Sequence, residues 1–249
     1  DLSGKVALVT GCRRGIGLAM ALALASAGAD IIGVSANLEA DGGEAQRGVE
    51  ALGRRFTALP TDLGDRAAVR ELAQHVLRHE APVDVLVNNA GTIERLPAVE
   101  HDEDIWDRVL EINLNAPFLL ARLLGRQMIE RGQGKMIFTA SMLSFQGGIG
   151  VASYTATKSA IAGIVRALSN EWAPMGVNVN AIAPGYIATD NTQALRADAL
   201  RSRSILDRIP AGRWGEPNDL AGATIFLAAR ASDYVCGTVV AVDGGWLAR

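Results

Sequence analysis

Tyr154 and Lys158 stand four positions apart and could together carry out acid–base chemistry. In a helix, residues at this spacing lie one above the other on the same face, so the ammonium group would lie near the phenol. The ordinary pKa of tyrosine is about 10, and it must fall by roughly 2 to 3 units for the phenol to exchange protons near neutrality. A nearby positive charge lowers the pKa of tyrosine. We therefore expect Lys158 to favour the phenolate form of Tyr154. Taken alone, this spacing is equally consistent with a tyrosine and a lysine that simply neighbour each other on the surface of a helix.

Ser141 provides a second chemical group thirteen residues before the tyrosine. It directly follows the predicted strand 136–140, and open α/β sheets bind their ligands outside the carboxyl ends of their strands. Its hydroxyl group can hold a substrate oxygen. In combination, Ser141, Tyr154 and Lys158 predict a catalytic centre.

A glycine-rich segment, Thr-Gly-Cys-Arg-Arg-Gly-Ile-Gly at 10–17, connects a predicted strand to a predicted helix. Glycines in this context allow a tight turn, and the exposed N–H groups of the following helix attract a pyrophosphate. The segment therefore predicts a dinucleotide cradle, with a purely structural turn as the alternative.

The choice between NAD and NADP depends on the end of the second strand. The fingerprint for NAD places an acidic residue there, whereas this chain has Ser35 and no carboxylate at that position. Arg13 and Arg14 could pair with a 2′-phosphate, or they could merely face solvent. The sequence leaves the coenzyme open between NAD and NADP.

Short apolar, β-branched runs alternate with longer helical stretches along the whole chain. The predicted strands are 6–10, 31–35, 56–59, 83–88, 136–140, 177–183 and 239–242, and the clearest helices are 18–27, 105–131, 153–172 and 220–229. This alternation predicts an α/β doubly wound Rossmann fold with about seven parallel strands and helices on both faces. We expect a single domain over 1–249, with a polar segment at 185–213 as a substrate lid that is partly helical over 192–209.

The composition excludes several classes of function. The net charge is −3 and the basic residues are dispersed, so nucleic acid is not an expected partner. No apolar run is long enough to span a membrane, and the first residues lack a secretory signal. Cys12 and Cys236 belong to no metal-binding pattern, and no metal is expected. We expect both to be buried or half-buried free thiols in a cytoplasmic protein.

Further motifs occur in the same order as in a known family: Asn-Asn-Ala-Gly at 88–91, Asn113, and Pro-Gly at 184–185. With the segments above, they make the chain resemble the short-chain dehydrogenases/reductases over essentially its whole length. The resemblance implies hydride transfer between nicotinamide C4 and a secondary alcohol or ketone, and a homotetramer with helix-paired interfaces.

The resemblance also implies roles for individual catalytic residues. Tyr154 would be the general acid/base, Lys158 would orient it and bind the nicotinamide ribose, and Ser141 would polarise the carbonyl. Asn113 would support a water-linked proton path, with a buried amide that bends a helix as the alternative.

For the cofactor, the resemblance implies contacts of Asp62 with the adenine and of Ile187 and Thr189 with the carboxamide. Asp62 could instead, or in addition, cap the next helix. The full cofactor-binding prediction is Gly11, Arg13, Arg14, Gly15, Ile16, Gly17, Ser35, Asp62, Leu63, Asn89, Ala90, Gly91, Tyr154, Lys158, Pro184, Gly185, Ile187 and Thr189.

Four stretches, 141–148, 191–196, 209–215 and 242–249, resemble those of dehydrogenases of deoxy sugar acids within the family. A guanidinium group would bind the carboxylate of such a substrate bidentately. Arg95 is the first candidate for it and Arg196 or Arg213 the second, with surface or interface salt bridges as the alternative. The predicted substrate residues are Arg95, Met142, Gln146 and Asn191.

Two other functions remain open at this point. One is an NADPH-dependent carbonyl or 3-oxoacyl reductase, which the serine at position 35 would suit. The other is a non-catalytic dinucleotide sensor on the same fold, although such a protein would have no need of an acid–base set.

Overall fold

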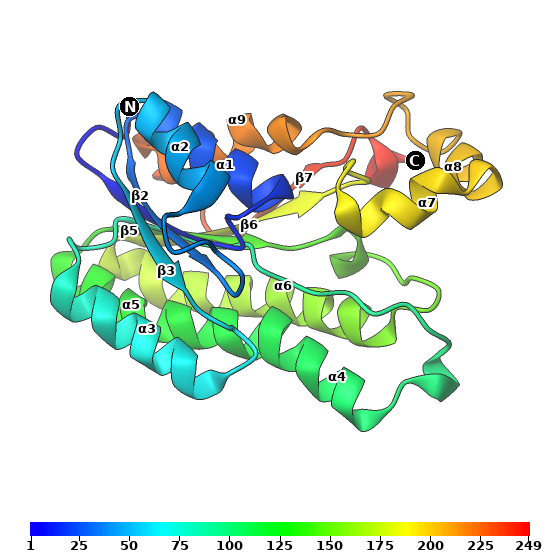
Figure 1. Ribbon diagram of the computed structural model, residues 1–249, viewed down its shortest axis with the longest axis horizontal. Coiled ribbons are helices and arrows are strands. Elements are labelled where there is room, and N and C mark those ends of the chain that lie inside the picture. The colour runs from blue at the N-terminus through cyan, green and yellow to red at the C-terminus, as the bar shows by residue number, and fades with distance from the viewer.

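The computed structural model describes residues 1–249, and its centre is one sheet of parallel strands (Figure 1). The strands lie in the order β3-β2-β1-β4-β5-β6-β7. Their bounds are β1 (Val6–Thr10), β2 (Asp30–Ser35), β3 (Phe56–Pro60), β4 (Val85–Asn88), β5 (Gly134–Thr139), β6 (Val177–Pro184) and β7 (Val239–Val242).

Helices cover both faces of this sheet. Helices α1, α2 and α9 lie on one face, and α3, α4, α5 and α6 lie on the other (Figure 1). The predicted doubly wound α/β fold is therefore confirmed. No helix is both long and apolar enough to cross a membrane. The bounds are α1 (Gly15–Ser26), α2 (Gly43–Ala51), α3 (Arg66–His79), α4 (Glu103–Leu110), α5 (Ala116–Arg131), α6 (Ala152–Trp172), α7 (Gln193–Ala197), α8 (Ala199–Leu206) and α9 (Ala221–Ala228).

The apolar strand residues divide between two cores. Because successive side chains of a strand point to opposite faces, Leu8 belongs to the core under α3, α5 and α6, whereas Ala7 and Val9 belong to the core under α1 and α9. All five residues of β1 are buried. This explains why the central strands are continuous apolar runs rather than alternating ones.

The order of the strands fixes where a ligand can bind. Strand β1 pairs with β2 on one side and with β4 on the other. The connections from β1 to β2 and from β3 to β4 therefore run to opposite sides of β1. The loops at the carboxyl ends of β1 and β4 diverge there and leave a crevice between them. The glycine-rich segment and the residues after β4 both lie at this edge.

The predicted helix 105–131 is wrong in one respect, because a π-helical turn (Glu111–Asn115) separates α4 from α5. Asn113 lies inside this turn and is buried. Its amide group bonds the backbone of Thr92 in both directions, with Oδ1 accepting from the N–H at 2.8 Å and Nδ2 donating to the carbonyl at 2.8 Å. These inward bonds stabilise the wider turn, and π-helical turns of this kind frequently occur at functional sites.

The segment predicted as a lid follows β6 and contains a short 3₁₀ helix (Asp190–Thr192), α7 and α8. Its apolar side chains, Ile205 and Ile209, pack with Met142 and with Trp246 from the C-terminal end of the chain. The guanidinium of Arg208 lies 4.0 Å from the centre of the Trp246 ring. The helical part of the segment is thus held by a small core of its own.

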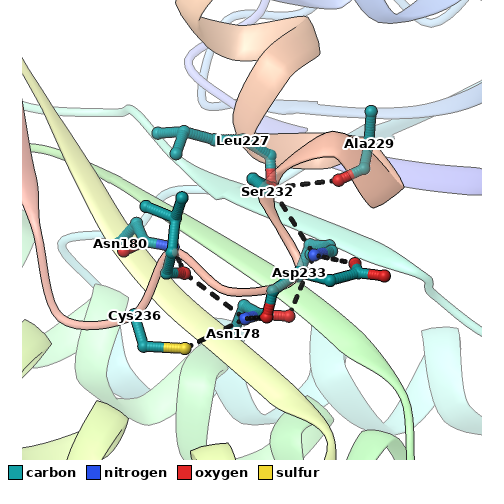
Figure 2. Close-up of polar contacts among 9 residues, drawn as sticks. Asn178, Asn180, Leu227, Ala229, Ser232, Asp233 and Cys236 are labelled. Carbon is teal, nitrogen blue, oxygen red and sulfur yellow. Dashed lines mark hydrogen bonds and ion pairs between the residues drawn. The ribbon is translucent and has the colours of Figure 1, made fainter.

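A cluster of polar side chains near the amino ends of β5 and β6 holds the loop before β7 in place (Figure 2). The side-chain amide of Asn178 donates to the backbone carbonyl of Asp233 at 2.9 Å and to Cys236 Sγ at 3.1 Å. Lys135 Nζ donates to Asp233 Oδ1 at 2.7 Å. Cys12 is buried and Cys236 is exposed. The prediction of a buried or half-buried thiol is therefore wrong for Cys236, because this loop runs over the surface.

Candidate active site

A cavity of about 680 Å³ lies at the carboxyl ends of the strands. All of the residues predicted to bind the cofactor line it, as do Ser141, Arg95 and Asn191. Asn113, Met142 and Gln146 are not part of its lining. The structure thus brings almost all of the predicted site residues together, although they come from segments far apart in the sequence.

The glycines of the cradle are required by close backbone packing. A Cβ atom at Gly17 would lie 2.1 Å from the carbonyl oxygen of Gly11 and 2.5 Å from Asn89 Nδ2. Gly11 has φ +71° and Gly15 has φ +59°, a region that residues with a Cβ rarely adopt. The loop can therefore turn tightly under the cavity only with glycine at these positions.

Helix α1 begins directly under the cavity. Arg14 occupies its N-cap position and makes no side-chain capping bond, so the N–H groups of the first turn are available to an anion. Together with the glycine positions, this arrangement fits the pyrophosphate of a dinucleotide.

The two arginines of the cradle are paired within the chain. Arg13 contacts Glu39, and Arg14 contacts Asp190 at the start of the lid segment. Their side chains are 43% and 63% exposed, so both arginines face solvent while each also forms an ion pair. Neither Glu39 nor Asp190 was predicted from the sequence, because each becomes a neighbour of the cradle only through the fold.

Side chains at the ends of three neighbouring strands are hydrogen-bonded to one another at the floor of the cavity. The Thr10 hydroxyl accepts from the backbone N–H of Asn89 at 3.0 Å, and Asn89 Nδ2 donates to the carbonyl of Thr10 at 3.0 Å. The Thr139 hydroxyl donates to Asn89 Oδ1 at 3.2 Å. The Asn-Asn-Ala-Gly motif therefore connects the ends of β1, β4 and β5.

Ser141 begins a 3₁₀ helix (Met142–Ser144) at the end of β5. Its Oγ accepts from the backbone N–H of Leu143 at 3.1 Å. The Ser144 hydroxyl donates to the backbone carbonyl of Lys158 at 2.6 Å and so connects this turn to α6. These bonds fix the position of the Ser141 hydroxyl relative to the helix that carries Tyr154.

Lys158 is buried beneath the tyrosine. Its Nζ donates to the carbonyl of Thr139 at 2.6 Å and lies 5.5 Å from the centre of the Tyr154 ring. Burial lowers the pKa of Lys158 to about 8, because removal from water disfavours the charged form. The i, i+4 placement on one helix is as predicted.

The electrostatics of Tyr154 differ from the prediction. Desolvation raises its pKa above the ordinary value, while the nearby Ser141 hydroxyl and the charge of Arg95 act in the opposite direction. In the protein alone, desolvation outweighs the charges around the phenol, so Lys158 does not by itself supply the lowering of the pKa that catalysis needs. A phenolate at this position therefore needs further positive charge.

Asn113 connects the turn that carries it to α6. In addition to its two bonds with Thr92, its Nδ2 donates to the hydroxyl of Thr157 at 3.3 Å. Its Oδ1 would lie 3.2 Å from a Cβ atom at Gly91. The side chain thus lies immediately behind the wall of the cavity and holds the residue next to Lys158.

Asp62 lines the cavity but does not cap a helix. Its Oδ1 accepts from the N–H of Gly64 at 2.8 Å. Asp65 is the N-cap of α3 and accepts from Ala67 and Ala68. The capping alternative for Asp62 is wrong, because the chain makes a further turn before α3 begins.

The predicted substrate residues divide into two groups. Arg95 and Asn191 face the cavity. Met142 belongs to the small core of the lid segment, and Gln146 Oε1 accepts from Trp246 Nε1 at 3.4 Å. These two therefore lie behind the cavity wall and connect it to the C-terminal segment.

The second-choice arginines have partners elsewhere. Arg213 makes two hydrogen bonds with Asp219, at 2.7 and 2.9 Å, and these bonds are the main reason why the pKa of Asp219 falls to about 2. Arg196 donates to the carbonyl of Thr189 at 3.2 Å. Both arginines thus stabilise the lid segment.

Other cavity residues were not predicted, including Thr139, Thr92, Ile93 and Ile112. All four stand within two residues of a predicted site residue, so their position in the chain was an available signal. Ile112 borders Asn113 in the π-helical turn, which no sequence pattern had indicated.

Comparison with known proteins agrees with this geometry. The family model for short chain dehydrogenases matches residues 5–200. A 2-dehydro-3-deoxy-D-gluconate 5-dehydrogenase of Pseudoalteromonas atlantica is 58% identical over 249 residues, which cover 100% of this chain and 98% of that protein. The protein of the same name from Escherichia coli is 53% identical over 250 residues, with 100% and 98% covered.

A solved structure gives the same relationship in three dimensions. The gluconate 5-dehydrogenase of Burkholderia cenocepacia, in complex with NADP and tartrate, superimposes with a TM-score of 0.94 at 38% identity and covers 100% of this chain and 97% of its own. The match to the family model extends over most of the chain, and the relatives match it from end to end. This chain therefore belongs to the short chain dehydrogenase family.

Proposed function

We propose that this protein is an NAD(P)-dependent oxidoreductase that interconverts a secondary alcohol and a ketone on a deoxy sugar acid of the 2-dehydro-3-deoxy-D-gluconate or 2-deoxy-D-gluconate type. The observation that carries the proposal is that Ser141, Tyr154 and Lys158 line one cavity together with Arg95 and the glycine cradle. An acid–base pair, an anion-binding cradle and a guanidinium group suit the redox chemistry of an anionic substrate.

The chain's own residues would handle the proton and the substrate oxygen. Tyr154 would take the hydroxyl proton during oxidation and return it during reduction, while Ser141 holds the same oxygen. Lys158 would orient the tyrosine, and Asn113 would support proton movement behind it. The nicotinamide cofactor, when bound, accepts or donates the hydride.

Arg95 is the proposed partner of the substrate carboxylate, because guanidinium binds carboxylate bidentately. Asn191, on the lid segment, would bond a substrate hydroxyl, and Met142 and Gln146 would shape that side of the pocket. The names of the relatives support a sugar acid. The tartrate in the Burkholderia protein is likewise a hydroxylated carboxylic acid.

The experiment that tests the function is a coenzyme and substrate panel followed at the absorbance of reduced nicotinamide. The purified protein is offered deoxy sugar acids, simple ketones and acyl ketones, each with NADH and with NADPH. Turnover on the sugar acids alone is the expected result and also identifies the coenzyme. Turnover confined to simple or acyl ketones would favour a general carbonyl reductase, and no turnover on any of them would favour a dinucleotide sensor.

We also propose a single catalytic domain with a lid at 185–213, assembled as a homotetramer in the cytoplasm. Trp106 of α4, Phe118 of α5 and Phe226 of α9 are 38%, 42% and 40% exposed, and large apolar side chains on helix surfaces favour helix-paired interfaces. The unpaired thiols suit a reducing compartment. Light scattering of the purified protein should give four times the mass of one chain, and the mass of a monomer would contradict this assembly.

A further inference from the structure

Arg13 in the cradle is held at the end of β2 by two contacts. Its backbone N–H donates to Ser35 Oγ at 3.2 Å. Its Nε and Nη2 donate to Glu39 Oε1, at 3.3 and 3.2 Å. Glu39 lies in the loop between β2 and α2, four residues after Ser35. The positive charge of Arg13 is therefore already paired with a carboxylate of the same chain.

The ion pair between Arg13 and Glu39 is weak enough for another anion to replace Glu39. Both hydrogen bonds end on one carboxylate oxygen and are longer than the 2.7–2.9 Å that is usual for charge-assisted bonds. The two side chains are 43% and 45% exposed, and ion pairs at such sites are weak. A phosphate group, which can accept two parallel bonds from a guanidinium, would be a stronger partner for Arg13.

Because of where the pair lies, replacement of Glu39 by another anion would affect which coenzyme binds. In dinucleotide-binding folds the group at the carboxyl end of the second strand meets the adenosine ribose, where NADP carries its 2′-phosphate. Here Ser35, Ala36 and Asn37 line the cavity at that end, and none of them is acidic. Glu39 is an anion at neutral pH, as an exposed glutamate ordinarily is, and hydrogen bonds from its own backbone N–H and from Arg13 lower its pKa further.

We propose that Glu39 is a determinant of coenzyme preference that acts by competing with the 2′-phosphate of NADP for Arg13. NADP binding would require Glu39 to release the guanidinium and would leave a carboxylate close to a phosphate. NAD binding would leave the pair intact. Glu39 therefore weakens the binding of NADP and has no effect on NAD. This inference rests on the proposed function, since it concerns the adenosine end of the same cleft.

The test measures binding without substrate, by titration calorimetry on the full chain. Adenosine 2′,5′-bisphosphate and adenosine 5′-monophosphate are the probes, with NADP and NAD as the complete ligands. Glu39→Gln should bind the 2′-phosphorylated ligands about five- to tenfold more tightly, from the loss of a weak competing pair and of charge repulsion. The affinity for the other two should not change, and the gain should shrink in 0.5 M salt, which screens exposed charges.

Two further variants separate competition for Arg13 from other effects. Glu44→Gln removes the same charge from the exposed first turn of α2 and should leave both affinities unchanged. In an Arg13→Ala background, Glu39→Gln should give a clearly smaller gain, because there is no guanidinium to release and only the charge repulsion is removed. Thermal melting of each variant verifies that the fold is intact.

The outcomes distinguish this inference from the function on which it rests. If the unaltered protein binds neither probe, the dinucleotide site itself is wrong and the inference falls with it. If it binds both probes and Glu39→Gln leaves the ratio of their two dissociation constants unchanged, only the role of Glu39 is overturned. A gain of undiminished size in the Arg13→Ala background would also overturn it.

Discussion

Replacing Tyr154 with phenylalanine should nearly abolish turnover while leaving cofactor affinity unchanged. The substitution removes the phenolic hydroxyl and keeps the ring that lies against Lys158. General acid–base catalysis contributes about 10²- to 10⁴-fold to rate, so the loss in kcat should fall in that range or above it. Steady-state kinetics and a nucleotide titration on the same sample measure the two quantities separately.

Tyr234→Phe is the matched control for this prediction, because Tyr234 is fully exposed. It should keep full activity. Full activity in Tyr154→Phe would contradict the mechanism. In the unaltered protein, oxidation of the alcohol needs the deprotonated tyrosine, so its rate should rise with pH. Because desolvation raises the pKa of Tyr154, we expect this rise to continue into the alkaline range.

Gly17→Ala should produce the second large effect, a loss of cofactor binding together with lower stability. The added methyl group would lie 2.1 Å from a backbone oxygen, and the backbone of the cradle cannot move without displacing the start of α1. Overpacking of this kind costs about 1–3 kcal/mol of unfolding free energy. A displacement of about 1 Å in a binding loop can cost on the order of 100-fold in function.

A dissociation constant for NADP and a denaturant titration measure these two effects. Gly222→Ala in α9 is the matched control, since the added group would meet no atom within 4 Å apart from its chain neighbours and the nearby backbone of its own helix, and it should be neutral or stabilising by up to about 1 kcal/mol. Normal cofactor binding in Gly17→Ala would show that the cradle does not need its close backbone contact.

The features that the sequence predicted well depend on residues that lie close together in the chain. The strand before Gly11 and the helix after Gly17 identify the cradle, and the spacing of Tyr154 and Lys158 places both on one helix face. Parallel strands end at the same edge of a sheet, so the fold class alone predicts that Ser141 and the segment 89–91 border one cavity. The structure describes the same arrangement.

The features that the sequence did not predict depend on the path of loops or on a balance of energies. The contact of Glu39 with Arg13 requires the turn after β2, which no motif indicates. The same is true of Asp65, rather than Asp62, as the cap of α3. The direction of the pKa shift of Tyr154 depends on desolvation as well as on charge, and burial is a property of the folded chain.

The π-helical turn between α4 and α5 places a constraint on the length of the chain. It contains one residue more than ordinary helical winding requires, and each residue of an α-helix turns the chain by about 100°. Deleting one residue from Glu111–Asn115 would restore ordinary α-helical winding between α4 and α5, with Pro117, which has no backbone N–H, inside the joined helix. It would also move Asn113 off the inward-facing side. Loss of a single codon here would therefore keep the segment helical while losing the link of Asn113 to Thr92 and Thr157, so the length of this segment is constrained as well as the identity of its residues.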